Sequence, residues 1–183
     1  EGEDGGAELG PGSSQQGLRT ECAGEVAGLS ALTATRGNED ETEDCASISL
    51  AMTSGALATS SITLGAATDE TRLRFVFEHL TATSGTAPYA PGAQPWTFTA
   101  RIPEAQRQLD AALSNTPREP TGFEGFFAHI ALDLAGRENR AVTFEDGAAS
   151  VALVTAIYHS ARTGRQVKLP LDPSHELYNG WLP

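Results

Sequence analysis

The sequence is poor in cysteine and in basic residues and has no long apolar run, and each scarcity excludes a class of protein. Its 183 residues include two cysteines, Cys22 and Cys45, and no cysteine–histidine pair has zinc-site spacing. Two distant cysteines favour free thiols in a cytoplasmic protein over one disulfide in a secreted protein. Only 12 lysines and arginines oppose 24 acidic residues, so the net charge of −12 repels phosphate backbones and argues against nucleic-acid binding. No stretch has the apolar length of a membrane span, so a membrane partner is not expected.

Two further signals are missing near the start of the chain and along its length. No strand pattern is followed by Gly-x-Gly-x-x-Gly, so no Rossmann domain for a dinucleotide is encoded here. The acidic stretch 1–17 has neither the basic start nor the apolar segment of a signal peptide. Residues 1–20 are rich in glycine, serine and glutamine, and we predict a disordered or poorly packed segment there, followed by one domain over 21–183. The first residue is not methionine, so a fragment of a longer protein is one interpretation.

Alternation of apolar and polar residues predicts a series of short strands in the first half of the chain. The strictest period of two is in 45–52, and Ser54-Gly55 is a turn signal directly after it. A proline- and glycine-rich loop over 85–95 interrupts the series. Strands are expected over 25–35, 45–52, 56–64, 72–79, 81–84 and 96–101.

Helical periodicity predicts three helices after these strands, over 103–115, 121–135 and 146–163. Gly164 has the position of a left-handed cap, and a last strand is expected over 167–169. Strands, then helices, then one strand are typical of an α+β domain, with an open, mostly antiparallel sheet and helices packed on one face. The apolar faces expected to be buried are Val151, Val154, Ile157, Tyr158 and Ala161 in the last helix, Phe123, Phe126, Phe127, Ile130 and Leu134 in the second, and Ala105, Leu109, Ala112 and Leu113 in the first.

Three sequence motifs occur in the order and spacing of one known domain. They are Gly24-Glu25-Val26, then Glu43-Asp44-Cys45-Ala46 with Ser54-Gly55-Ala56-Leu57, and finally the helix end from Ala156 to Arg165. Over roughly residues 24–170 the chain resembles the C-terminal domain of the Gfo/Idh/MocA family (glucose–fructose oxidoreductase / inositol dehydrogenase), a dihydrodipicolinate-reductase-like α+β fold.

The resemblance implies a division of labour between two domains. A complete family member has a Rossmann domain that binds NAD or NADP, whereas the C-terminal domain shapes a pocket for a sugar or polyol and makes oligomer contacts. The family's catalytic lysine belongs to a Glu-Lys-Pro motif that this chain lacks. The family's histidine and aspartate positions fall on Ser14 and Gly17, neither of which is a general acid or base near neutral pH. We therefore expect no catalytic residue, no cofactor site and no metal site in this chain.

Three residues are candidates for substrate contacts: Arg36, Tyr89 and Trp96. Arg36 follows the first strand, where a substrate contact and a surface salt bridge are equally good interpretations. Tyr89 and Trp96 flank the 85–95 loop, and aromatic faces stack on sugar rings. The alternative, which we favour for Trp96, is that its ring anchors the loop onto the sheet.

The other titratable residues are expected to be structural. We predict a half-buried structural role for His129, exposed positions for His79 and His159, and too few ligands around His175 and Glu176 for a metal. Glu43 and Asp44 are adjacent on a strand, so they point to opposite faces and do not form an acid–base pair. A solvated strand start is the expectation for both.

The function expected from these observations has two alternatives. The first is the substrate-binding and oligomerisation domain of an NAD(P)-dependent oxidoreductase that acts on a sugar or polyol, cytoplasmic, without its cofactor domain and not catalytic by itself. The second is a stand-alone, non-catalytic domain that dimerises, or pairs with a full-length relative, through its sheet. For both, the small residues of 56–63 provide a flat face for a partner.

Overall fold

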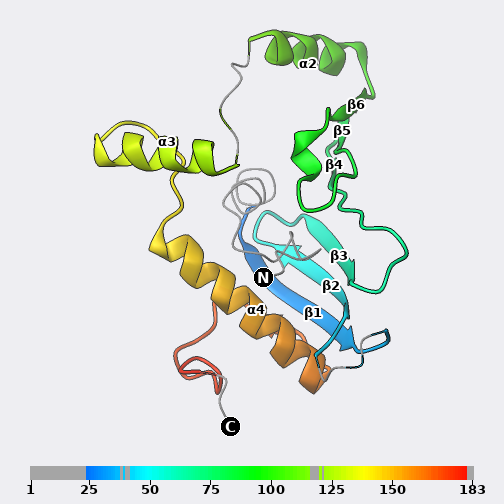
Figure 1. The fold of residues 1–183 in the computed structure, drawn as a ribbon, viewed down its shortest axis with the longest axis vertical. Coiled ribbons are helices and arrows are strands. Elements are labelled where there is room, and N and C mark those ends of the chain that lie inside the picture. The colour runs from blue at the N-terminus through cyan, green and yellow to red at the C-terminus, as the bar shows by residue number, and fades with distance from the viewer. Residues whose placement is uncertain (1–23, 38, 40–41, 116–119, 121, 181–183) are drawn as a thin grey trace. The chain divides into compact units, whose positions relative to one another are not determined.

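A computed structural model describes residues 24–180 apart from 38, 40, 41, 116–119 and 121 (Figure 1). The predicted disorder of 1–20, and the thiol of Cys22, lie outside the described residues. The described chain divides into two compact units, one up to Ala66 and from His129 onward, the other from Ala67 to Ala128.

The first unit contains a four-stranded antiparallel sheet with the order β3-β2-β1-β7. Its strands are β1 (Val26–Ala34), β2 (Cys45–Met52), β3 (Leu57–Thr63) and β7 (Val167–Lys168), close to the ranges predicted from the sequence. The turn between β2 and β3 needs a positive φ, which Gly55 provides at 86°. No described pair of neighbouring strands is parallel, in agreement with the antiparallel pairing that the sequence predicts.

One long helix, α4 (Phe144–Thr163), packs along β1, as Figure 1 shows. Thr143 begins it with a capping box, in which the Thr143 hydroxyl accepts from the Asp146 amide and the Asp146 side chain accepts from the Thr143 amide. Gly164 ends it in the left-handed conformation, with φ 67°, as the sequence predicts.

The buried face of α4 differs from the predicted apolar stripe. Ile157 is buried as expected, but Val151 is 66% exposed, and the buried positions are Leu153, Thr155, Ala156, Ile157 and Ser160. The small side chains of Ala156 and Ser160 let the helix approach the sheet closely, so close packing and not apolar character selects the face. Leu29 and Ile48 are the large, fully buried residues on the facing sheet surface.

The hydroxyl of the buried Ser160 joins three segments of the first unit. It accepts a hydrogen bond from the Ala31 amide at 3.0 Å and donates to the Arg165 carbonyl at 2.7 Å. The β1–β7 register pairs Leu29 with Val167, so continuing it by two residues would set Ala31 opposite Arg165. Ser160 therefore bridges β1 to the residue just before β7, and satisfies a strand amide that would otherwise be buried without an acceptor.

The second unit contains a separate three-stranded antiparallel sheet, β4-β5-β6. The α+β class with open antiparallel pairing is thus confirmed, and the strands are divided between two sheets where the sequence predicts one. Residues 64–70, all exposed, separate the two sheets along the chain. The elements of the second unit are β4 (Arg74–Val76), β5 (Leu80–Thr83), a 3-10 turn η1 (Pro91–Ala93), β6 (Thr97–Ala100) and α2 (Pro103–Asn115).

The shorter helices bury less than their apolar patterns predict. In α3 (Gly122–Leu134), Phe123, Phe127 and Leu134 are exposed, and Gly125 is the buried residue of this helix. In α2 no residue is buried. Period alone does not determine what covers an apolar face, and among the described elements α3 has no extensive contact with a strand or helix. None of the described helices combines the length and the apolar character needed to cross a membrane.

The Ser160 bridge makes a prediction about stability. Ser160→Ala leaves the buried Ala31 amide without its acceptor, which costs about 1–3 kcal/mol in the free energy of unfolding. Ser150→Ala is the matched control, because the Ser150 hydroxyl bonds to the Asp146 carbonyl of the same helix and bridges no other element. Denaturant unfolding of both variants measures the difference. Equal stabilities would show that the bridge contributes nothing.

Candidate functional site

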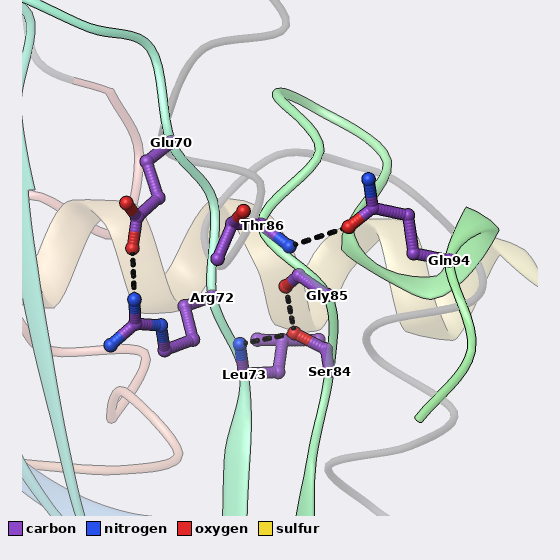
Figure 2. A network of polar contacts seen from close by, with 7 residues as sticks. All are labelled: Glu70, Arg72, Leu73, Ser84, Gly85, Thr86 and Gln94. Carbon is purple, nitrogen blue, oxygen red and sulfur yellow. Dashed lines mark hydrogen bonds and ion pairs between the residues drawn. The ribbon is translucent and has the colours of Figure 1, made fainter. Parts of the chain in front are cut away.

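The proline- and glycine-rich loop of the second unit is held by polar contacts at both ends (Figure 2). The Leu73 amide donates to Ser84 Oγ at 2.9 Å, and the same hydroxyl donates to the Gly85 carbonyl at 2.7 Å. Across the loop, the Thr86 amide donates to Gln94 Oε1 at 3.0 Å. The loop is therefore an ordered surface, which is what a binding loop on a small scaffold requires.

Tyr89 lies in the middle of this loop with its backbone fixed and its side chain exposed. Its amide donates to Oγ1 of the buried Thr71 at 3.2 Å. Its φ of 59° is in the left-handed region, which is uncommon for a bulky residue and is typically found at functional or tightly constrained positions. The residue is 52% exposed. This arrangement presents one aromatic ring to solvent at a defined place.

Trp96 ends the loop with its ring against the sheet. It is half-buried and stacks on Phe75 of β4, with ring centroids 6.0 Å apart and planes at 28°. Phe75 in turn stacks on Phe77 at 6.5 Å. The contact is the one expected if Trp96 anchors the loop onto the sheet, and it leaves part of the ring exposed at the end of the loop.

Arg36 lies in the first unit, in the bend after β1, with an exposed side chain. Its amide donates to Asp44 Oδ1 at 2.9 Å, and the Gly37 amide donates to Oδ2 at 2.6 Å. Asp44 is buried, so the expected solvated position is wrong for this residue: its carboxylate is the acceptor for two bend amides. Because Arg36 and the pair Tyr89–Trp96 belong to different units, one substrate pocket shared by all three stays a prediction.

The outer face of the first sheet carries no charged side chain on three neighbouring strands, β1, β2 and β3. The pairing places Leu32, Ser47 and Ser61 in one row and Ser30, Ser49 and Thr59 in the next. Leu57, on the edge strand, is 83% exposed and Leu32 is 68% exposed. For a chain with a net charge of −12, this uncharged surface is distinct, and we call the exposed residues Ser30, Leu32, Ser47, Ser49, Leu57, Thr59, Ser61 and Thr63 the outer sheet face.

A cavity of about 290 Å³ lies elsewhere in the first unit, at the end of α4. The prediction of an exposed His159 is wrong, because the C-terminal segment folds back over it and leaves its side chain 17% exposed. His159 Nδ1 lies 3.1 Å from Glu176 Oε1, and its ring meets that of His175 edge-on at 4.7 Å. The cavity is lined by His159, Arg165, Gln166, Val167, Lys168, Pro170, Leu171, Asp172 and His175.

Sequence reasoning missed this cavity because its residues come from a helix end and a tail without periodicity. The one available signal is the pair His175–Glu176, which offers too few ligands for a metal. Within the described part of the chain, no group of three or more histidine, cysteine, aspartate or glutamate side chains is arranged to hold a metal ion. The other predicted positions agree: His79 is exposed, and Nδ1 of His129 accepts the Arg140 amide at 3.1 Å.

No family model and no curated protein matches the chain. Solved structures do. The WlbA dehydrogenase from Bordetella pertussis, in complex with NADH and UDP-GlcNAcA, is 23% identical, with a TM-score of 0.63 over 87% of this chain and 44% of that one. The WlbA dehydrogenase from Chromobacterium violaceum, with the same ligands, is 25% identical, with a TM-score of 0.61 over 87% and 45%.

A third similar structure is an oxidoreductase from Agrobacterium radiobacter in complex with NAD⁺, L-tartaric acid and magnesium. It is 22% identical, with a TM-score of 0.58 over 85% of this chain and 47% of that one. The chain therefore spans less than half the length of each of these three oxidoreductases.

The cavity's one carboxylate makes a prediction. The Ser174 hydroxyl, at 2.6 Å, and the Ser174 amide, at 2.8 Å, both donate to Asp172 and lower the pKa of its carboxyl below its ordinary value. The turn is thus favoured above the ordinary pKa and weakens as the pH falls through the lowered one. Ser174→Ala should raise the pKa of Asp172 in a carboxyl NMR titration, with every other carboxyl unchanged. An unchanged Asp172 would exclude the hydroxyl as the main cause.

Proposed function

We propose a function from one premise: the chain has the fold of the C-terminal domain of Gfo/Idh/MocA-type oxidoreductases. The function is that of the substrate-binding and oligomerisation domain of an NAD(P)-dependent oxidoreductase that acts on a sugar or polyol. The observation that carries this proposal is the match of 87% of the chain to less than half of enzymes solved with NADH and a sugar nucleotide. A cytoplasmic location goes with it, and the free thiol of Cys45 is consistent with that.

The chemistry explains why such a domain needs a second one. Hydride transfer requires a nicotinamide ring held against the reacting carbon, and proximity of this kind supplies much of the rate. The described part of the chain has no parallel strand–helix–strand unit to hold a dinucleotide. The cofactor would therefore come with a Rossmann domain, and this domain would contribute substrate contacts, for which the ordered loop carrying Tyr89 and Trp96 is suited by its aromatic faces.

Association through the outer sheet face is the second part of the proposal. Two copies with a net charge of −12 each repel one another wherever their acidic surfaces meet. The outer sheet face is free of that repulsion, since β1, β2 and β3 contain no charged residue, and it exposes Leu32 and Leu57. Lys168 of β7, opposite Gly28, is the nearest charge along the sheet. A face-to-face pair of such sheets buries small side chains without leaving a charge unpaired.

A specific observation also favours the alternative, a stand-alone domain that pairs with itself or with a full-length relative. The same uncharged face would serve that role without any catalytic chemistry. The coding sequence upstream of Glu1 separates the two. A Gly-x-Gly-x-x-Gly motif and a Glu-Lys-Pro there support the oxidoreductase domain, whereas a start codon immediately before Glu1 supports the stand-alone domain.

The first prediction of this proposal concerns the cofactor. The 183-residue chain should not bind NADH in a saturable manner, because its sequence contains no Gly-x-Gly-x-x-Gly motif between a strand and a helix. Fluorescence titration of NADH, with a complete nicotinamide dehydrogenase as the positive control, measures this. A measurable dissociation constant for the chain alone would overturn the division of labour proposed here.

The second prediction concerns the outer sheet face. The purified chain should be a dimer, and Ser49→Arg should make it monomeric, because Ser49 lies between Ser30 and Thr59 in the middle of that face. Val151→Arg, an exposed position on α4, should leave the dimer intact. Size-exclusion chromatography with light scattering reports the mass. A monomer at the highest concentration measured, or equal effects of both variants, would contradict association through this face.

A further inference from the structure

The cavity at the end of α4 is built from segments that the first unit fixes in place. Gly164 turns the chain, and the carbonyl of Arg165 accepts from Ser160, so the backbone of Arg165 is held. The Leu169 amide donates to the Ala27 carbonyl at 3.0 Å. Because the amides of a strand point alternately to its two sides, the Lys168 amide is directed to the free edge of β7, where the cavity opens.

Among the described residues, the basic side chains that line this cavity have no acidic partner. No ion pair joins Arg165 or Lys168 to a carboxylate in that part of the chain, although acidic residues outnumber basic ones by 24 to 12. Asp172 is the carboxylate in the lining, and it accepts both the hydroxyl and the amide of Ser174. Glu176 is engaged by His159. The local carboxylates are thus occupied while two cations remain.

The two histidines have their ring hydrogens assigned by their neighbours. His175 Nδ1 accepts the Leu177 amide at 3.2 Å, so in the neutral ring the hydrogen is on Nε2, which is a donor. His159 Nδ1 faces a carboxylate oxygen of Glu176 and carries its hydrogen there, which leaves Nε2 of His159 as an acceptor. The cavity therefore contains a neutral donor, two cations and one acceptor.

We propose that this cavity is a binding site for a small ligand with an oxyanion group, a carboxylate or a phosphate, held by Arg165, Lys168 and Nε2 of His175. Charge-assisted hydrogen bonds from these groups match an oxyanion, and Arg165 is able to bind it with two parallel bonds. The Nε2 acceptor of His159 fits a hydroxyl on the same ligand. The volume of about 290 Å³ limits the ligand to a small metabolite. The cavity shares no residue with the loop of Tyr89 and Trp96, so this site and the function proposed above can fail independently.

The test is an amide NMR titration of the full chain with inorganic phosphate, and separately with acetate, at constant ionic strength. Saturable shifts around residues 165–168 and 175–177 are expected with at least one of the two ions, and the ion that binds identifies the head group. Arg165→Gln should weaken that binding about tenfold, the loss of one charge-assisted hydrogen bond. The fold should be retained, because the contact of Arg165 with Ser160 is made by its carbonyl.

Arg162→Gln is the matched control, because Arg162 is exposed in the last turn of α4 and does not line the cavity. It carries the same change in charge and should alter the affinity by less than about twofold, the size of a screened surface effect. Equal weakening by both substitutions would mean attraction to the surface in general and would overturn the proposed site. Absence of saturation with both ions would overturn it as well.

Discussion

The hydroxyl of Ser160 lies where a helix, a central strand and the last strand meet, and the first unit depends on this junction. It accepts from Ala31 and donates to Arg165, two residues far apart in the sequence that are joined through α4. A larger side chain would separate the helix from the sheet, and an apolar one would leave a buried strand amide without an acceptor. The serine in the helix-end motif thus has a physical reason: it completes the sheet where β7 is too short to do so.

The same junction determines what lies at each end of α4. Gly164 and Arg165 follow it directly, so the chain enters β7 in a fixed register and the C-terminal segment returns over His159 to close the cavity. On the opposite surface of the sheet, the residues that alternate with the buried ones are serine, threonine and leucine and carry no charge. One helix docked on one face therefore leaves the other face available, which is the arrangement that the proposed assembly role uses.

Local patterns predicted the elements well, whereas long-range contacts set what each face buries. The period of two in β2, the turn at Gly55, the helix over 103–115 and the cap at Gly164 are decided by neighbouring residues, and the structure confirms them. The buried face of α4 was mispredicted because hydropathy ranks Val151 above Ser160, although only a small residue fits against β1. The burial of Asp44 and of His159 depends on partners that no local pattern contains. Of the candidate site, the ordered loop of Tyr89 and Trp96 was predictable from composition, and the cavity was not.

Hydrogen exchange at the Ala31 amide tests the central claim most directly, since that hydrogen is the one the Ser160 hydroxyl holds. Amides protected until global opening exchange slowest, and those without a partner exchange near the rate of a free peptide. Ala31 should exchange as slowly as the amides in the middle of the β1–β2 ladder, such as Ser30 and Leu32. Exchange of Ala31 as fast as that of the exposed 64–70 segment would show that helix, strand and sheet edge are not joined through Ser160.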